Sequence, residues 1–529
     1  GGEVPLKVGN AGPGDGLGWR WLVLCTSLLG VGWSILTARA PAPVKWVDVN
    51  APHVSKDLAE AVGIMLGATV VTVALLVLRG RAQGRRQGAV EWRRPLRAAE
   101  LELRPLAALP WVAFAMLTDD SILGPARMLS VAVAAWLLAS SDWGWLTARV
   151  TPMVRAVGEK RAMWAALTVA YVAAVVHLVH LANLRIDSLN ARTFDLGIYD
   201  NILFNTLHGN FLGCSMIKGG VHTSAHFDPI LGLLAPIYAL APGARTVVMI
   251  QAVWVLSGAF PATLIARRSV GRAASLTVGL AWLAYPSVHG IVLHDMHSYA
   301  LMAPLLMWMV LLGLDERWRA YAVVTLVTLT VREDTALCVM GVGAWLIAAR
   351  METVRGVMTI AVAAAYLAIV KFGVMPDSGL LMQNSDEVYA YANRYRRLIP
   401  EGGGARDAAL TVATNPAFLV GHVITRQKIA SAVILLVPLA GLPLLGRRRL
   451  VLAVWGTAFI YLASKPSLSY PLVHYTSALY PALFAALPVG MATFDRWLAW
   501  RPAGAVEAHL RRHFTTRWVL ASALLAGCS

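Results

Sequence analysis

Charged residues are scarce in this sequence. Only 14% of its 529 residues are Asp, Glu, Lys or Arg, whereas 57% are hydrophobic. A soluble domain carries about 25% charged residues, so the deficit excludes an ordinary soluble protein. Apolar stretches of roughly 17–25 residues recur along the chain instead, each long enough to cross about 30 Å of hydrocarbon. The sequence therefore predicts an all-α, polytopic membrane protein.

Acidic residues and cysteines are also few. The 29 Asp and Glu residues are outnumbered by 46 Lys and Arg residues, which gives a net charge of +17. This excess does not indicate nucleic-acid binding, because the arginines lie in short loops between apolar stretches, as topology determinants do. Three of the four cysteines fall in or next to apolar stretches, and no two of the four are at metal-ligand spacing, so a disulfide framework is not expected. The four are Cys25, Cys214, Cys338 and Cys528.

Several common functional motifs are absent. The sequence contains no Walker A motif, no dinucleotide-binding glycine fingerprint and no His-Glu-x-x-His segment. Each of these motifs carries a defined chemistry, namely phosphate cradling, pyrophosphate binding or zinc-dependent hydrolysis. Their absence disfavours ATP-driven transport and zincin-type proteolysis.

The apolar stretches predict about fifteen transmembrane helices. They lie near residues 18–38, 58–79, 105–119, 122–142, 162–184, 244–267, 272–290, 297–314, 318–332, 335–350, 356–375, 429–446, 449–464, 475–493 and from 515 onward. The first four form an N-terminal transmembrane extension within residues 1–150, which has few polar residues outside its loops. Residues 160–529 form a larger transmembrane domain that carries the unusual polar motifs.

Loop charges predict the orientation. Residues 79–104 contain eight arginines against three glutamates, which is typical of a cytoplasmic loop. By the parity of the spans, the two long loops 185–243 and 376–428 then lie on the extracytoplasmic side. The apolar, proline-containing stretch 228–242 does not span in this topology, because a crossing there would invert every later loop. We expect it to form a helix at the membrane interface.

The first extracytoplasmic loop is rich in acids and imidazoles. Asp195 and Asp200 stand five residues apart, and His226 and Asp228 follow immediately before the apolar stretch. Carboxylates in such a place can act as a general base or hold a divalent cation. The alternative is that the two aspartates only cap interfacial helices.

Three further polar motifs fall on the same side of the membrane. His294-Asp295-Met296-His297 places two imidazoles three residues apart, which on one helix face suits a metal, although binding of a phosphate or a sugar hydroxyl is favoured. Arg332-Glu333-Asp334 predicts either a phosphate clamp or a local ion pair. Lys465, followed by His474 and Tyr475, offsets pyrophosphate charge or snorkels to the interface.

Taken together, these motifs resemble an uncharacterised family of predicted bacterial multipass membrane proteins that is grouped with the GT-C clan of glycosyltransferases. The resemblance covers roughly residues 162–490. The segments that carry it are Thr193-Phe194-Asp195-Leu196-Gly197-Ile198-Tyr199-Asp200, Asn205-Thr206-Leu207-His208-Gly209, His226-Phe227-Asp228-Pro229-Ile230, His294-Asp295-Met296-His297, Arg332-Glu333-Asp334-Thr335-Ala336-Leu337 and His474-Tyr475.

The resemblance implies a GT-C-like helix bundle with interfacial helices in its first large extracytoplasmic loop. It also implies a glycosyltransferase in the bacterial cytoplasmic membrane. Such an enzyme moves a sugar from a polyprenyl-phosphate or polyprenyl-pyrophosphate donor to a lipid, glycan or protein acceptor at the extracytoplasmic face. The expected partners are membrane lipids, the polyprenyl-linked donor and other membrane proteins, without nucleic acid.

The same resemblance assigns roles to individual residues. Asp195 is expected to be the base, and Asp200 is expected to assist it or to share with it a divalent cation, Mg²⁺ or Mn²⁺. Arg332 and Lys465 are expected to stabilise the phosphate leaving group. The remaining expected substrate-binding residues are His226, Asp228, His294, Asp295, His297, Glu333, His474 and Tyr475. The two aspartates are not adjacent, unlike the acidic pair of many clan members, which leaves the choice of base and the metal dependence open.

Two other classes of protein fit parts of the sequence. A non-catalytic GT-C-like subunit of a membrane complex would retain the scaffold and lose the chemistry. A lipid or solute transporter would place charged residues deep within the spans, whereas here they gather at one surface.

Overall fold

The computed structural model describes residues 120–141, 143–191, 193–217, 219–350, 352–375, 394–400, 403, 405–500 and 513–528, together with isolated residues of 71–112. Several predictions lie outside the described residues, wholly or for the most part. They are the spans 18–38, 58–79 and 105–119, the basic loop 79–104 and the first part of the loop 376–428.

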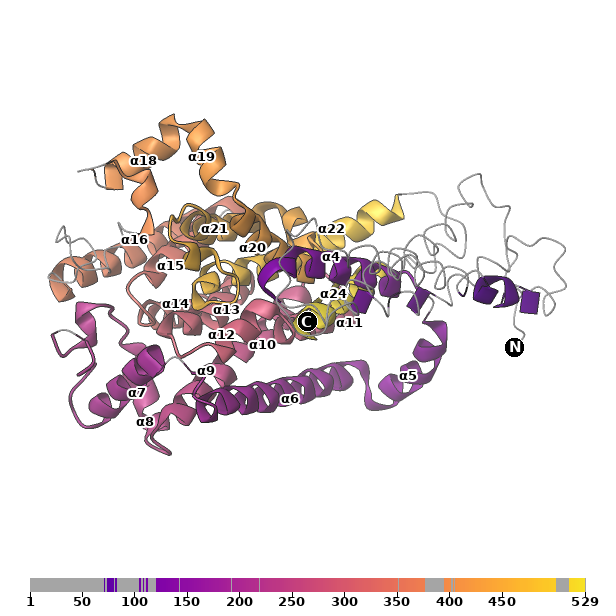
Figure 1. The fold of residues 1–529 in the computed structure, drawn as a ribbon, viewed down its shortest axis with the longest axis horizontal. Coiled ribbons are helices and arrows are strands. Elements are labelled where there is room, and N and C mark those ends of the chain that lie inside the picture. Colours follow the sequence, from indigo (N-terminus) through magenta and orange to yellow (C-terminus); the bar gives the residue numbers. More distant parts are fainter. Residues whose placement is uncertain are drawn as a thin grey trace, which may run out of the picture. The chain divides into compact units, whose positions relative to one another are not determined.

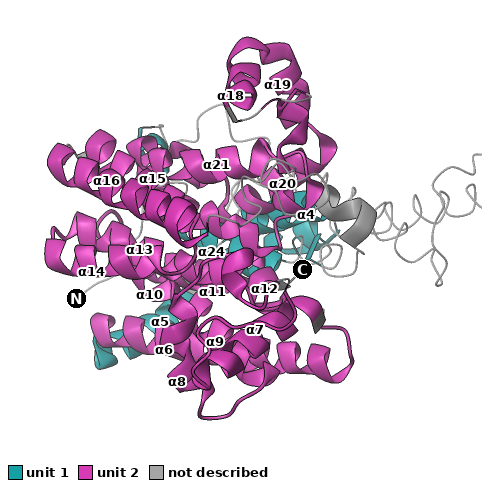
Figure 2. Ribbon diagram, turned by 90° about the vertical axis from the view of Figure 1, so that its left-hand side faces the viewer, with its two compact units in different colours: residues 1–158, 494–529 teal, residues 159–493 magenta. Residues whose placement is uncertain are grey.

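Within the described part of the chain, every named element is a helix, and an isolated bridge joins Gly213 to Val221. The all-α prediction is confirmed there. The chain divides into two compact units, residues 1–158 with 494–529 and residues 159–493 (Figure 2). The sequence predicts a division into residues 1–150 and 160–529, but it does not associate the C-terminal residues with the N-terminal ones.

In the described part of the first unit the helices are α4 (Asp120–Ala139), α5 (Gly144–Val157) and α24 (Phe514–Cys528). Helix α24 packs along α4, and Arg517 donates a hydrogen bond of 2.8 Å to the carbonyl oxygen of Ser141 at the end of α4. This pairing brings residues 376 positions apart in sequence into contact.

The second unit contains the polar motifs and most of the helices, several of which are short 3₁₀ or π turns (Figure 1). Its elements are α6 (Glu159–Asp187), α7 (Thr193–Leu207), η1 (His222–Ser224), α8 (Ile230–Tyr238), α9 (Ala244–Leu256), α10 (Ala259–Ala266), α11 (Arg272–Leu283), α12 (Pro286–Leu293), η2 (Ser298–Leu301), α13 (Met302–Leu314), α14 (Trp318–Leu329), α15 (Thr335–Arg350), α16 (Thr353–Ile369), η3 (Val370–Val374), η4 (Arg396–Leu398), α18 (Ala405–Thr414), α19 (Pro416–Val423), α20 (Arg426–Leu436), η5 (Val437–Leu439), η6 (Leu442–Leu445), η7 (Arg447–Leu452), α21 (Ala453–Tyr461), η8 (Pro466–Ser469), η9 (His474–Ala478) and α22 (Tyr480–Ala499), whose last residues belong to the first unit.

Four described helices are long and apolar enough to cross a membrane: Glu159–Asp187, Ala244–Ala266, Arg272–Leu293 and Thr353–Val374. Each lies where the sequence predicts a span. A bent pair, Pro416–Val423 with Arg426–Leu439, adds a fifth candidate with a break of 63°. The membrane class is thus confirmed at this coarser level, and the larger number of spans stays a prediction.

Burial separates these four helices into two kinds. In α6 and α16 only 17% of the apolar window is buried, so most of their side chains face away from the second unit. The spans formed by α9–α10 and α11–α12 are 67% and 61% buried and form its interior. The aromatic core around Trp282 illustrates this interior, since its ring lies 5.2 Å from Tyr480 and 5.0 Å from Phe484.

Helix α8 is the stretch that the sequence assigns to the membrane interface. It has nine residues, which rise only about 13.5 Å and cannot cross the hydrocarbon alone. Gly243, with φ of 140°, separates it from α9. Helix α8 packs against α7, which follows α6 in the chain (Figure 1). The residues between α7 and α8, which belong to the first polar loop, are therefore held between two helices that pack on each other.

Helices α15 and α16 pack closely through glycine. A Cβ added at Gly343 would lie 2.8 Å from the carbonyl oxygen of Gly356, closer than real side chains approach. At Gly341, two residues earlier in the same helix, an added Cβ would meet nothing within 4 Å. Small residues at helix contacts are typical of membrane proteins, because they let the backbones approach.

The two glycines form a matched pair for a stability test. We expect Gly343→Ala to lower the free energy of unfolding by about 1–3 kcal/mol, because the helices must separate. Gly341→Ala should cause no loss, since alanine is the better helix former in open space. Thermal unfolding of the full chain in detergent measures both changes, and equal effects of the two substitutions would contradict the packing described here.

Candidate functional site

The turn between α12 and η2 is held by a buried amide. Gln251 of α9 is completely buried, and its Nε2 donates a hydrogen bond of 2.9 Å to the carbonyl oxygen of Ile291. Its Oε1 accepts a hydrogen bond of 3.0 Å from the backbone N–H of His297. Because both ends of the turn are tied to one side chain, the positions of its imidazoles are fixed by α9.

The turn itself is extended. His294 has φ −78° and ψ 164°, and His297 has φ −142° and ψ 123°. The expectation that these histidines share a helix face is therefore wrong, because α12 ends at Leu293 and Gln251 takes up the N–H of His297. The two imidazoles nevertheless approach each other, with ring centroids 5.3 Å apart.

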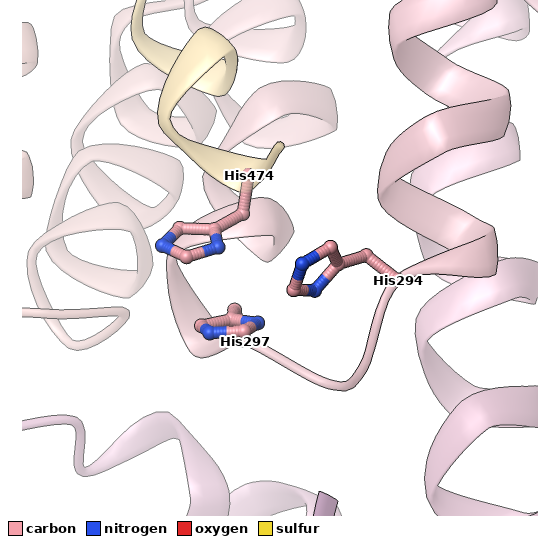
Figure 3. A group of neighbouring side chains, drawn as sticks. All are labelled: His294, His297 and His474. Carbon is pink, nitrogen blue, oxygen red and sulfur yellow. The ribbon is translucent and has the colours of Figure 1, made fainter. Parts of the chain in front are cut away.

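His474 completes a cluster of three histidines (Figure 3). It comes from the first position of η9, and its ring stacks on that of His297 with centroids 3.6 Å apart and an interplanar angle of 17°. One ring nitrogen from each of His294, His297 and His474 lies within 4.8 Å of the other two. The sequence predicts each residue as a site residue, but only the fold brings the third beside the first two.

The environment keeps the imidazoles of His297 and His474 uncharged. Burial, followed by the positive charges of neighbouring groups, lowers the pKa of His297 to about 3 and that of His474 well below its ordinary value. The Nδ1 of His297 lies 2.8 Å from the carbonyl oxygen of Asp295, which can only accept, so Nδ1 carries the proton. The Nε2 of His297 is then left with a lone pair.

Asp195 faces this lone pair from the first turn of α7. Its Oδ2 lies 3.8 Å from the Nε2 of His297, and its side chain is 37% exposed. Tyr199, one turn later, is buried and makes a hydroxyl–hydroxyl hydrogen bond of 3.2 Å with Ser298. This contact fixes α7 against the start of η2 and so holds Asp195 beside the histidines.

Asp200 has different surroundings from Asp195. Its Oδ1 accepts a hydrogen bond of 2.8 Å from the hydroxyl of the buried Tyr238 in α8. Residues five apart in a helix point about 140° away from each other. The structure therefore directs one aspartate towards the histidine cluster and the other towards α8, and the shared cation stays a prediction.

Two further carboxylates are buried against histidines. Asp228 is completely buried, and its Oδ1 lies 2.6 Å from the Nδ1 of His222. Glu333 is also completely buried, and it accepts from the Nδ1 of His226 at 2.8 Å and from the backbone N–H of Phe227 at 2.9 Å. The second pair ties the loop before α8 to the turn between α14 and α15. Its two residues, His226 and Glu333, are 107 positions apart in the sequence.

The guanidinium of Arg332 is paired with the carboxylate of Asp334. Its Nε and Nη2 donate to the two carboxylate oxygens of Asp334 at 2.7 Å and 2.5 Å, and both residues are buried. The guanidinium carbon lies 4.0 Å from the centre of the Tyr299 ring, which is the geometry of a cation–π contact. Of the two interpretations that the sequence leaves open for this motif, the structure contains the local ion pair.

An exposed basic segment lies beside His474. The backbone carbonyl oxygen of Arg394 accepts hydrogen bonds from the N–H groups of Ser464 and Lys465, so η4 and the start of η8 are joined. Arg396, Arg397 and Lys465 are exposed there. The guanidinium of Arg394 lies 5.4 Å from the ring centre of Tyr475, whose own ring is 4.1 Å from His474. Lys465 therefore lies in this basic segment and not among the buried carboxylates.

Sequence reasoning missed several residues of this site. Gln251 lies within an apolar run and is not among the predicted site residues, although a lone amide in a span is itself a sign of function or of close packing. Tyr199 and His222 lie in the first loop, but their contacts depend on residues far away in sequence. Tyr238 and Tyr299 carry no sequence signal beyond being aromatic residues near the predicted interface.

The fold and the site define a class: an all-helical membrane protein with a buried carboxylate–imidazole network between its helices. A comparison with known families supports the membrane part of this class. The chain belongs to the family of predicted membrane proteins DUF2079, whose match covers residues 185–527. No curated protein and no solved structure matches it.

The Glu333–His226 contact can be tested against a surface ion pair of the same unit. We expect Glu333→Gln to lower the free energy of unfolding by about 1–3 kcal/mol, because a buried acceptor of two hydrogen bonds is replaced. Glu352, which pairs with Arg355 at 2.9 Å on the surface, serves as the control. Glu352→Gln should cost less than about 1 kcal/mol. Thermal unfolding in detergent compares the two, and an equal cost would contradict a network that depends on burial.

Proposed function

We propose that the protein is a membrane glycosyltransferase of the GT-C type. In this proposal it moves a sugar from a polyprenyl-phosphate or polyprenyl-pyrophosphate donor to an acceptor hydroxyl at the extracytoplasmic face of the bacterial cytoplasmic membrane. The acceptor is a lipid, a glycan or a protein. Membership of a membrane protein family and the apolar helices support the membrane location.

The accessibility of Asp195 carries the proposal. Asp228, Glu333 and Asp334 are buried and each has a close partner, whereas the side chain of Asp195 is 37% exposed. A general base must reach the proton that it removes. Among these carboxylates, Asp195 is the one that an acceptor hydroxyl can reach.

The proposed reaction is a displacement at the anomeric carbon. Asp195 takes the proton of the acceptor hydroxyl while the acceptor oxygen forms a bond to the anomeric carbon. The bond between that carbon and the donor phosphate oxygen breaks, and the lipid phosphate leaves with the bonding electrons. Positive charge placed where the phosphate becomes more negative lowers the barrier.

The exposed basic segment suits the lipid phosphate. Arg396, Arg397 and Lys465 are exposed, and the segment reaches the histidine cluster through Arg394 and Tyr475. Arg332, whose Nε and Nη2 are taken by Asp334, would act through its charge and by holding the turn rather than as a two-pronged clamp. Phosphate binding at the basic segment thus replaces part of the role that the sequence assigns to Arg332.

Substitution of the two aspartates tests the mechanism. We expect Asp195→Asn to lower sugar transfer by about 100-fold or more, which is the usual contribution of a general base. Asp200→Asn should lose far less, since an amide oxygen can still accept from Tyr238. Transfer is measured as labelled sugar moved from polyprenyl-linked donor into acceptor glycan, using membranes that contain equal amounts of each variant.

Asp315 is the matched control, because it pairs with Arg268 on the surface, away from the network. Asp315→Asn should transfer sugar at the wild-type rate. Full activity of Asp195→Asn would exclude the mechanism, whatever the activity of Asp200→Asn. Copurification of a stoichiometric protein partner without any transfer would favour the non-catalytic subunit instead.

The proposed orientation has its own test. In a chain whose natural cysteines are replaced by serine, we expect Ser188→Cys to react with a membrane-impermeant maleimide in intact spheroplasts. Arg448→Cys should react only after permeabilisation. Both positions are exposed in the second unit, so the difference reports the side of the membrane. Labelling of Arg448→Cys in intact spheroplasts with protection of Ser188→Cys would invert the topology.

A further inference from the structure

The histidine cluster is a site that the proposed sugar transfer does not itself require. We propose that His294, His297 and His474 bind one Zn²⁺ ion, with Asp195 beside the fourth coordination position. The inference stands independently of the transferase proposal, although the two share Asp195.

The ligand atoms are gathered from two distant segments. One nitrogen from each imidazole lies within 4.8 Å of the other two, although His474 is 177 residues away from His297 in the sequence (Figure 3). Zinc–nitrogen bonds of about 2.0–2.1 Å in a tetrahedral site place the nitrogens about 3.3 Å apart. Binding would therefore require the stacked rings of His297 and His474 to rotate about their side-chain torsions, so that the nitrogens approach one another.

The surrounding hydrogen bonds orient the cluster as ligands are oriented in known metal sites. A metal-bound histidine usually donates its other N–H to a carbonyl or carboxylate oxygen. His297 does so, since its Nδ1 donates to the carbonyl oxygen of Asp295, which leaves Nε2 to bind a metal. Gln251 fixes the backbone of the same turn from a different helix.

Two observations indicate that a cation is needed here. The Nδ1 of His474 is buried and has no hydrogen-bond partner among the described residues, whereas more than about 90% of buried polar groups have one. The Oδ2 of Asp195 lies 3.8 Å from the Nε2 of His297, so a carboxylate oxygen stands beside the cluster. A carboxylate at this distance favours a cation that is bound to the three imidazoles.

The ligand type selects the metal. Imidazole nitrogens suit Zn²⁺ and related transition metals, whereas Mg²⁺ and Mn²⁺ prefer carboxylate and water oxygens. Three histidines with an open fourth position are also an arrangement found at catalytic zinc centres. The cation expected from the sequence is therefore replaced in this proposal by a different metal at a different set of residues, with Asp195 in common.

The test uses the full chain purified in detergent without chelators. We expect elemental analysis to find about one equivalent of zinc per chain. After a chelator has removed this zinc, adding Zn²⁺ back should raise the unfolding temperature of the protein. Mg²⁺ at the same concentration should not. His297→Gln and His474→Gln should each weaken Zn²⁺ binding by more than about 100-fold in a competition titration with a chromophoric chelator, since loss of a supporting residue alone costs 10–100-fold. Gln251→Leu, which removes a supporting residue, should weaken Zn²⁺ binding by about 10–100-fold.

The matched control is His208→Ala, because His208 lies exposed in the turn after α7 and its Nδ1 contacts only the carbonyl oxygen of Phe204 at 2.7 Å among hydrogen-bond partners in the described structure. It should bind zinc as wild type does. Absence of zinc from the wild type, with no effect of added Zn²⁺ on unfolding, would overturn the proposal even if every variant failed to fold. Equal loss of zinc in His208→Ala and His474→Gln would overturn it as well.

The two proposals fail separately. Zinc binding is measured without any sugar, so a zinc-free protein that transfers sugar contradicts only the metal site. If the wild type binds zinc at the histidines and the Asp195→Asn variant transfers sugar at the normal rate, only the catalytic role of Asp195 is contradicted.

Discussion

The completely buried carboxylate of Glu333 is the constraint on which the rest of the site depends. An ionised carboxylate cannot stay in the interior of an apolar helix bundle unless hydrogen-bond donors meet it. Glu333 meets two, the imidazole of His226 and the N–H of Phe227. The loop that follows α7 therefore returns to the turn between α14 and α15, and Asp195 of α7 lies beside His297.

The same principle organises the neighbouring segments. Asp228 is satisfied by His222, and Arg332 by Asp334 with Tyr299 beneath it, so most of the buried charge is neutralised locally. Such pairs add little net stability compared with apolar packing, but breaking one is costly. They hold the turns in one arrangement. Asp195 and the histidine cluster lie among these turns, and the side chain of Asp195 is 37% exposed.

The sequence predicts part of this arrangement. Apolar length is a local property, so the sequence predicts the four spans that the structure contains. The loop charges indicate that the stretch of α8 does not cross, because a crossing there would invert every later loop. The convergence of the 195, 226, 294, 332 and 474 regions was predicted from topology alone. The extended turn at His294–His297 could not be predicted, because it depends on Gln251 in another helix. Nor could sequence decide between a phosphate and Asp334 as the partner of Arg332, since both satisfy the same donors.

The central claim is that a substrate is bound where Asp195, the histidine cluster and the basic segment meet. Its most direct test is a cryo-electron microscopy structure of the full chain in a lipid nanodisc with a polyprenyl-phosphate sugar. The account predicts phosphate density at Arg396, Arg397 or Lys465 and the sugar within hydrogen-bond distance of the Asp195 carboxylate. A headgroup bound elsewhere, with no part of it within reach of Asp195, would contradict the account.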